Sequence, residues 1–439
     1  MNRSIQIEIT IKHLAQQGVF SGKKLFIFGM NAFTAAIQRT LINVGYALAA
    51  ILDNNVEKQG NEMYGLRICS PYTAAVPFDD NSMFIIASKY FSEMASQLED
   101  MGYSCQAHVI QLLDSDSIAS PDFISEQLIE SGIESAKRGL KLYSDLCEVG
   151  SDTLTVFLSP VSSIGDIFLL GLYFSKFIAK TGISEYFLLI PGKAGVGIAE
   201  SYGIKNVMFI TQEDSADLMA FKMLIGLDYC DIRILHCGYL HQRIVCNIIM
   251  HRNMTWLENY RQFLFGFSKD AQFQRRKVNV NWLSARKTLR KNGLIPGKTV
   301  ILSPYAQTLA PLSDDFWSEL AKELKNTGFT VCTNVAGKER EIVGTTPLSF
   351  SLDDAETVLE QAGYFVALRS GLCDVVSMCG CKKIILYTQE VFECIKVIDF
   401  YSLNKMGLCN DAIEIEVTYN QEIDINSVIA AICADEEDF

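Results

Sequence analysis

A segment near residue 370 joins a buried strand to residues that can bind an anion. The apolar strand Tyr364–Leu368 runs into Arg369, Ser370 and Gly371, and a helix is expected from about Cys373. Such a helix directs free backbone N–H groups and the positive end of its dipole toward a bound group. Arg369 adds a bidentate donor, Ser370 a hydroxyl, and Gly371 room for close backbone approach. We expect a phosphate or diphosphate here; the alternative is an ordinary strand-to-helix turn with a solvated arginine.

A carboxylate stands at a second strand-to-helix junction. The strand Leu154–Leu158 is followed by a loop at 159–166 that ends in Asp166, and by an amphipathic helix over Ile167–Ile178. A carboxylate at a helix start is favoured by the dipole and stays ionised, so Asp166 can accept a proton from an alcohol. The alternative is a cap that only stabilises the helix, by about 1 kcal/mol.

Other motifs favour structural interpretations. The glycine-rich run Pro191–Gly197 lacks the Gly-Lys-Ser/Thr ending of a phosphate-binding loop and is interpreted as a loop. His236, Cys237 and His241 have no carboxylate spaced to complete a metal site, so we expect packed or cleft-lining histidines. We therefore predict no metal and no cofactor.

Composition limits the class of partner and the compartment. The 439 residues contain 51 acidic and 38 basic side chains, a net charge of −13, without a long run of like charges. Nucleic acid is therefore not expected as the main partner. The 13 cysteines are odd in number and show no paired spacing, which favours a reducing compartment. No signal peptide or membrane-spanning apolar run is found, so a cytoplasmic protein is expected, with peripheral membrane contact left open.

Residues 1–115 are predicted to form an α/β unit. Strand Lys24–Phe28, a helix over 32–44 and strand Ala49–Leu52 lead to Asp53, 24 positions after Gly29. Dinucleotide-binding folds place a ribose-binding carboxylate at about this distance. Asn31 and Thr34, however, stand where the second and third glycines of that motif belong, so we predict no NAD or NADP binding.

The same unit resembles the small Rossmann-like N-terminal domain of bacterial sugar O- and N-acyltransferases over about 90 residues. The motifs are Phe26–Gly29, Ile51–Asn55, Gly65–Ile68 and Phe84–Ser88. In that family the domain contacts a nucleotide-linked sugar. The six-residue repeat of the acyltransferase partner domain is absent from the sequence, so acetyl transfer is not implied. An accessory role in docking or substrate recognition is expected.

The remaining chain is predicted to form a helical linker at 116–150 and two parallel-sheet α/β domains at 151–295 and 296–439. Residues 253–295 are expected to be helical. A helix from about Ser313 to Lys325 is expected to be capped by Ser313 and Asp314. Two such domains in tandem leave a cleft suited to a ligand. Further strands are predicted at Tyr186–Ile190, Val207–Ile210, Ile232–Leu235, Lys298–Ser303, Thr330–Thr333 and Ile384–Tyr387.

Four motifs in order resemble the heptosyltransferase group of glycosyltransferases, which have the two-Rossmann-domain fold called GT-B. They are Ser162–Asp166, Ser303–Thr308, Arg369–Gly371 and Lys383–Tyr387, within residues 154–390. The resemblance implies that Asp166 is the general base and that Ser163 and Gly165 belong to the acceptor-side loop.

The resemblance also implies a donor site, from which this sequence departs. The usual motif is Asp-Ser/Thr-Gly-x-x-His, and here Arg369 replaces the first Asp and Asp374 replaces the His. Ser370, Gly371, Ser303 and Thr308 are the further donor-binding residues expected, with Arg369 supplying the charge that a lysine supplies in relatives. The segment Arg369–Asp374, Arg-Ser-Gly-x-Cys-Asp, also resembles segments of uncharacterised bacterial surface-polysaccharide transferases.

Together these features predict a glycosyltransferase that moves a sugar from a nucleotide-diphosphate donor to a hydroxyl of a glycan, glycolipid or protein. Transfer is expected to invert the anomeric centre and to need no metal. A nucleotide-sugar epimerase and a non-catalytic sugar-nucleotide-binding assembly protein are the alternatives. The sequence does not define the sugar, the base, the acceptor or the oligomeric state.

Overall fold

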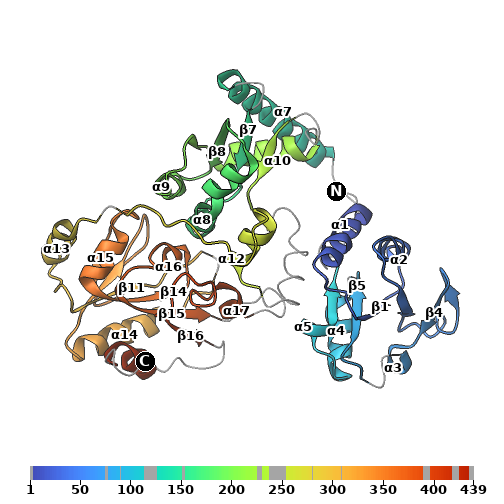
Figure 1. Ribbon diagram of the computed structural model, residues 1–439. Helices are drawn as coiled ribbons and strands as arrows, with labels where there is room; N and C mark the ends of the chain where they lie inside the picture. Colours follow the sequence, from blue (N-terminus) through green and yellow to red (C-terminus); the bar gives the residue numbers. More distant parts are fainter. Residues whose placement is uncertain are drawn as a thin grey trace. The chain divides into compact units, whose positions relative to one another are not determined.

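The structure is a computed structural model that describes residues 3–74, 78–88, 90–112, 126–150, 154–224, 230–236, 254–278, 280–307, 309–388, 396–417 and 425–434. The described residues fall into two compact units. The first unit contains one β-sheet, and the second contains two more (Figure 1).

The first unit is a doubly wound sheet in the order β3-β4-β2-β1-β5-β6. Its strand pairs are parallel except for β3 with β4. The strands are β1 (Lys24–Phe28), β2 (Leu48–Leu52), β3 (Glu62–Met63), β4 (Leu66–Cys69), β5 (Ser82–Ile86) and β6 (Val109–Gln111). The helices are α1 (Arg3–Gln16), α2 (Thr34–Asn43), α3 (Pro71–Ala74), α4 (Phe91–Asp100) and α5 (Cys105–His108).

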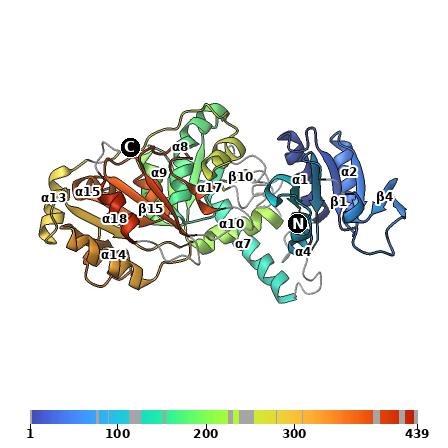
Figure 2. The same ribbon diagram turned by 90° about the horizontal axis from the view of Figure 1, so that it is seen from below.

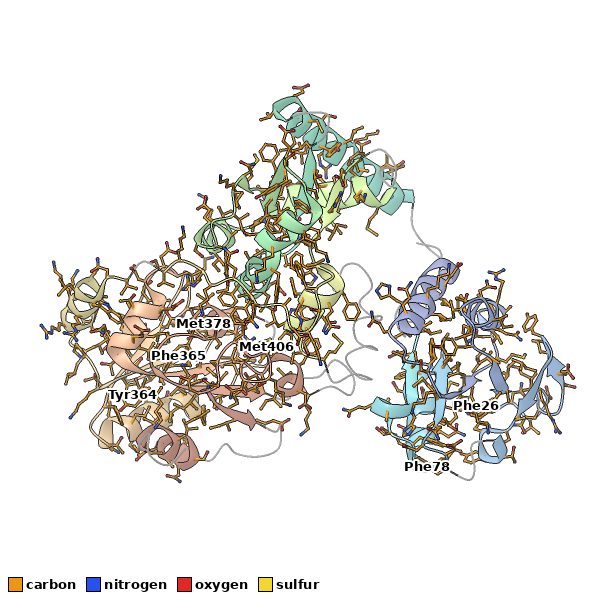
Figure 3. The ribbon with its side chains drawn as sticks, viewed as in Figure 1. Phe26, Phe78, Tyr364, Phe365, Met378 and Met406 are labelled. Carbon is orange, nitrogen blue, oxygen red and sulfur yellow. The ribbon has the colours of Figure 1, made fainter. Side chains whose placement is uncertain are left out.

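The sheet of the first unit is buried on both faces, as a parallel sheet requires. Phe26 and Phe84 stack with ring centroids 5.3 Å apart, and helix α4 adds Met94 and Leu98 to the same core. Phe26 is labelled in Figure 3. The α/β expectation for this unit is confirmed, and the predicted strand Lys24–Phe28 has the same bounds in the structure.

The second unit begins at Glu130, within α7 (Glu126–Val149), and continues into a four-stranded parallel sheet in the order β10-β7-β8-β9. The core on one face of this sheet includes Leu158, Leu189 and Phe221. The elements are β7 (Thr155–Leu158), α8 (Ile164–Thr181), β8 (Tyr186–Ile190), α9 (Lys193–Ser201), β9 (Val207–Phe209), α10 (Gln212–Leu224) and β10 (Ile232–Ile234).

The segment between the two sheets of this unit is only partly helical, which corrects the expectation for 253–295. Helix α12 (Trp256–Asn259), the π-helix η1 (Tyr260–Leu264) and α13 (Trp282–Lys291) are helical. Most of the described residues between η1 and α13 have no regular structure. Instead, Gln274 and Lys277 donate backbone N–H groups to Leu172 and Ser201, so this stretch is held along the first sheet's helices.

The third sheet has six parallel strands in the order β13-β12-β11-β14-β15-β16. Its strands are β11 (Thr299–Ser303), β12 (Thr330–Asn334), β13 (Thr346–Leu348), β14 (Gly363–Leu368), β15 (Lys382–Thr388) and β16 (Ile413–Val417). Its helices are α14 (Asp314–Asn326), α15 (Ala355–Ala362), α16 (Gly371–Val375), α17 (Val397–Tyr401) and α18 (Ile425–Cys433).

Helices α14 and α18 pack side by side on one face of the third sheet (Figure 2). Trp317 and Leu320 from α14 meet Val428 and Ile432 from α18 in this core. Phe365, labelled in Figure 3, is fully buried in β14. The predicted fold class, tandem Rossmann-like sheets after a smaller α/β unit, is confirmed by these three sheets.

Three local expectations change in the structure. Helix α8 begins at Ile164 rather than Ile167, so Gly165 and Asp166 belong to its first turn. Helix α16 begins at Gly371 and has five residues. At α14, Ser313 caps the helix by accepting from the Phe316 N–H, as expected, whereas Asp314 is already a helical residue.

Membrane-spanning helices and disulfide bonds are both absent from the described residues. Within the described part of the chain, no helix combines the length and apolar character needed to cross a membrane. No disulfide bond joins the cysteines that the structure describes, which are 69, 105, 147, 230, 332, 373, 379, 381, 409 and 433.

Candidate active site

The first turns of α8 and α16 meet through two glycines. A Cβ placed on Gly165 would lie 3.1 Å from the Gly371 Cα and 2.7 Å from an Asp374 carboxylate oxygen. A Cβ on Gly371 would lie 2.6 Å from the Gly165 backbone nitrogen. Real Cβ atoms do not approach so closely, so both positions require glycine. The two predicted motifs are therefore in contact in space.

Asp166, beside this contact, is held by aromatic donors. Its Oδ1 accepts a hydrogen bond from the Trp256 indole N–H at 2.9 Å and from the Tyr260 hydroxyl at 3.0 Å. The Nε2 of His236 lies 3.7 Å from the same oxygen. The carboxylate is thus fixed in one orientation, with its side chain 19% exposed.

These neighbours keep Asp166 ionised. Burial acts to raise the pKa of Asp166, but His236 and the hydrogen bonds from Trp256 and Ser163 outweigh it and hold the pKa below its usual value. A carboxylate offers about four lone-pair sites, so it can accept a further hydroxyl in addition to these donors. The group is therefore a proton acceptor at neutral pH.

The aromatic donors come from the short helical segment that follows Met254. Thr255 and Glu258 form a capping box in which each side chain bonds the other residue's backbone N–H. Trp256 and Tyr260 are four residues apart and so share one helix face. Trp256 also packs against Phe400 in α17, with ring centroids 5.3 Å apart. The indole therefore links Asp166 to the third sheet's helices.

Arg369 makes a buried bidentate ion pair with Asp374. Its two terminal nitrogens lie 3.0 Å from Oδ2 and 2.6 Å from Oδ1 of that carboxylate. The Nε donates to the Tyr401 carbonyl at 2.9 Å, and Nη1 also donates to the Ser370 carbonyl at 2.6 Å. Both residues are nearly inaccessible, at 5% and 3% exposure.

In this ion pair, the cost of burying each charge is opposed by the attraction of the partner's charge. Burial acts to lower the pKa of Arg369, yet the charge of Asp374 raises it overall, so the guanidinium stays protonated. Burial raises the pKa of Asp374, and the negative charge of Asp166 adds to that effect against Arg369. In this structure the guanidinium therefore faces an internal carboxylate, and its contribution to donor binding stays a prediction.

Two of the other predicted donor residues, Ser370 and Ser303, follow or end strands of the third sheet, and Ser163 was predicted for the acceptor-side loop. Ser370 is the N-cap of α16, and its hydroxyl lies 3.8 Å from the Cys373 sulfur. Ser303 ends β11, is buried, and accepts a weak hydrogen bond from Asn334 at 3.5 Å. Ser163 is the N-cap of α8. Thr308 lies outside the described residues.

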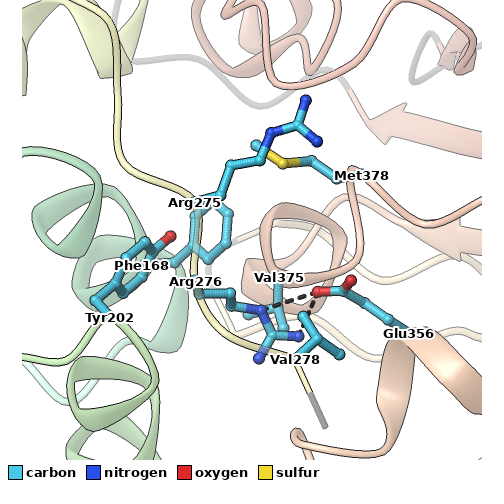
Figure 4. A pocket seen from close by; sticks show the side chains of 8 residues that line it. All are labelled: Phe168, Tyr202, Arg275, Arg276, Val278, Glu356, Val375 and Met378. Atoms are coloured by element: carbon cyan, nitrogen blue, oxygen red, sulfur yellow. Dashed lines mark hydrogen bonds and ion pairs between the residues drawn. The ribbon is translucent and has the colours of Figure 1, made fainter. Parts of the chain in front are cut away.

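A small cavity lies where residues 275–278 pass between the two sheets' helices (Figure 4). Its volume is ≈ 170 Å³. Arg276 forms an ion pair with Glu356 that lines this cavity, while the guanidinium of Arg275 extends toward Met378. The remaining lining residues are Phe168, Tyr202, Val278 and Val375. The Arg276 to Glu356 pair joins the connecting segment to α15.

Sequence reasoning missed the residues that surround Asp166. His236 was expected to be packed or to line a cleft, and its ring packs against Trp256 and Tyr260, but its contact with Asp166 was not foreseen. Cys237 and His241 lie outside the described residues. The described part of the chain contains no group of three metal-ligating side chains. Thr255-x-x-Glu258 before an apolar run is a capping-box signal and marks the helix start that carries Trp256. The tertiary contact with Asp166 has no sequence signal.

Comparisons with known proteins give remote structural matches. No protein-family model and no curated protein matches the sequence. A structure of the E. coli heptosyltransferase WaaC with ADP matches at 13% identity and a TM-score of 0.39, covering 63% of this chain and 98% of that one. The E. coli ADP-heptose heptosyltransferase II matches at 14% and 0.43, covering 63% and 97%.

A family 9 glycosyl transferase from Veillonella parvula matches at 12% identity and a TM-score of 0.38, covering 65% of this chain and 91% of that one. These neighbours are glycosyltransferases. Because the TM-scores lie below 0.5, the functional proposal rests on the residues of the site.

Proposed function

We propose that the chain is an inverting glycosyltransferase that uses a nucleotide-diphosphate sugar as donor and a hydroxyl of a glycan, glycolipid or protein as acceptor. The observation that carries the proposal is Asp166, an ionised carboxylate that Trp256 and Tyr260 fix at the start of α8. The neighbouring residue Gly165 contacts the start of α16. A fixed, ionised carboxylate beside a second strand-to-helix turn is suited to activating an alcohol next to a bound phosphate group.

In the proposed reaction Asp166 removes the proton of the acceptor hydroxyl as its oxygen attacks the anomeric carbon. The bond between that carbon and the diphosphate oxygen breaks, and the electron pair leaves with the nucleoside diphosphate. Attack from the face opposite the leaving group inverts the anomeric centre. The proton ends on Asp166 and is lost to water after the products leave.

The departing diphosphate is proposed to lie at the end of the third sheet, near Ser370 and Ser303, with Thr308 as a further expected donor outside the described residues. Gly371 contacts α8, so the donor reaches the α16 amides from the side of Ser370. Helix α16 has only five residues, so its dipole is weak, and hydrogen bonds from amides and hydroxyls carry most of the stabilisation. Asp374 is occupied by Arg369, which supports a metal-independent reaction because no free carboxylate remains at α16 to hold a cation.

Product analysis with ADP- and UDP-sugars tests the proposal. The purified protein is incubated with each donor and with simple glycoside acceptors, and products are separated by mass and by nuclear magnetic resonance. A new glycosidic bond with equal release of nucleoside diphosphate is expected. An isomerised donor without release would indicate an epimerase instead. Nucleotide binding without any product across the panel would indicate a non-catalytic binding protein.

A further inference from the structure

The first unit contains a cavity of ≈ 420 Å³ that the catalytic proposal does not use. It lies beyond the carboxyl ends of β1, β2 and β5, with lining residues that include Gly29, Asp53 and Ser88. The strand order places β2 on one side of β1 and β5 on the other, so the chain winds in opposite directions from β1. Ligands of open α/β sheets bind at such a switch point.

In the turn after β1, the backbone N–H groups that could bind a phosphate already donate to protein groups. Asp53, buried below the turn, accepts the Met30 N–H at 2.9 Å and the Lys58 ammonium at 3.1 Å. Three other amides of the turn also have partners: Gly29 donates to the Leu52 carbonyl, Asn31 to the Thr34 hydroxyl, and Phe33 to the Asn31 side chain.

The charge of the lining also disfavours an anion. Asp53 and Glu93 oppose the single cation Lys58, whose ammonium is already bonded to Asp53. A diphosphate here would meet a net negative lining, and the backbone N–H groups of Gly29, Met30, Asn31 and Phe33 already have partners. The lining therefore does not favour an anion, and a neutral ligand has to be recognised by its hydroxyl and apolar groups.

The upper part of the cavity offers groups that bind hydroxyls. Asn54 and Gln97 bond each other reciprocally, with N–H to oxygen distances of 2.8 and 3.1 Å. Each side-chain amide has two N–H donors and two acceptor lone pairs, so each keeps one N–H and one lone pair for a ligand. Tyr90, 55% exposed, lines the same cavity as these amides and contributes an aromatic side chain to it. An apolar ring next to paired donors and acceptors suits a sugar, which has apolar C–H faces and hydroxyl edges.

We propose that this cavity binds one neutral monosaccharide unit and that the first unit is a second sugar-binding site of the chain. The inference does not rest on the proposed transfer reaction, since it is argued from the lining of the first unit alone. A volume of ≈ 420 Å³ lies within the range of ordinary small-molecule sites.

Saturation-transfer difference NMR on the full chain tests the inference, with the methyl glycosides of glucose, galactose, mannose and N-acetylglucosamine as probes. At least one glycoside is expected to bind. Tyr90→Ala and Gln97→Ala should each weaken that binding about tenfold, equal to about 1.4 kcal/mol. Ser96→Ala, an exposed change on the same helix outside the cavity, is the matched control and should bind as the wild type does.

Three outcomes overturn the inference. If none of the four glycosides binds, the cavity is not a sugar site. If binding occurs but is unchanged in both cavity variants, the sugar binds the second unit. If Tyr90→Ala and Gln97→Ala instead weaken UDP, ADP or NADH, the cavity takes a nucleotide. Activity with nucleotide sugars is measured in parallel on the same variants, so failure of the catalytic proposal is seen separately.

Discussion

At the scale of single residues, Asp166 carries the proposed chemistry, and its amide analogue isolates that role. Asp166→Asn keeps the size of the side chain but cannot take the acceptor's proton. We expect turnover to fall about 10²- to 10⁴-fold, the usual contribution of a general base, with donor affinity within a few fold of the wild type. Nucleotide release in a coupled assay measures the change.

Asp314→Asn is the matched control for this substitution. Asp314 is an exposed carboxylate in the first turn of α14, so its loss changes only a helix start. If Asp166→Asn turns over like this control, Asp166 acts as a helix-stabilising residue and the base lies elsewhere.

The pH dependence of transfer follows from the lowered pKa of Asp166. Proton acceptance needs the ionised form, so kcat/KM should stay high as the pH falls and decline only below the usual aspartate pKa of 3.8. A profile of kcat/KM against pH, limited to values at which the protein stays folded, measures the acid limb. An acid limb well above pH 4 that vanishes in Asp166→Asn would contradict the lowered pKa.

The Arg369 to Asp374 pair predicts a stability effect. Arg369→Ala leaves Asp374 buried without its partner, and breaking such a pair typically costs about 3–5 kcal/mol. The double variant Arg369→Met with Asp374→Leu should recover most of this free energy of unfolding, because it removes both buried charges. Urea unfolding of the three proteins gives the values.

Calorimetric titration with ADP and adenosine gives the complementary measurement on Arg369→Ala. If the variant unfolds like the wild type but loses affinity for ADP alone, the guanidinium serves the donor diphosphate. If the affinity for both ligands declines along with stability, the ion pair acts as a brace.

At the scale of elements, the contact between α8 and α16 admits no side chain. Gly165→Ala would place a methyl group within 2.7 Å of an Asp374 oxygen. We expect a loss of about 1–3 kcal/mol in the free energy of unfolding, as for other overpacked sites, together with reduced transfer. Urea unfolding and the coupled assay measure the two effects.

Gly197→Ala in α9 is the matched control. No atom lies within 4 Å of its Cβ position, so the alanine should stabilise by about 0.5–1 kcal/mol through its helix preference. Equal effects at the two positions would mean that the helix contact is not tight in solution.

How far the sequence predicts these elements depends on how local the signal is. Buried strands such as Tyr186–Ile190 were predicted to the residue because an apolar run between turns is local. The start of α8 was placed three residues late, since Gly165 weakens the helix pattern. The stretch between η1 and α13 was wrongly expected to be helical, because its contacts with Leu172 and Ser201 are tertiary.

The site shows the same division. Asp166 and the turn at Ser370 were each predicted from a short motif, whose residues are neighbours in the sequence. Trp256 and Tyr260 lie 90 and 94 positions from Asp166, so no spacing rule connects them. Arg369 is expected to bind a phosphate or to be solvated, whereas the structure pairs it with Asp374, five residues away.

At the scale of the whole molecule, the two compact units predict that nucleotide acts on only one of them. ADP or UDP at 100 times its dissociation constant should stabilise the second unit by about 2.7 kcal/mol. Scanning calorimetry of the full chain should show one unfolding transition that shifts and one that does not, and NADH should shift neither. The transition of the first unit is identified by variants that destabilise that unit. If ADP or UDP shifts this transition, the division is contradicted.

The contact between Gly165 and Gly371 also has a consequence for synthesis of the chain. About 200 residues separate the two glycines, so at roughly 5–20 residues per second the second follows the first by about 10–40 s. During that interval the start of α8 lacks its contact with α16, although Trp256 and Tyr260, which bond Asp166, are already synthesised. The contact between α8 and α16, where the proposed chemistry lies, is therefore completed only after most of the chain has been synthesised.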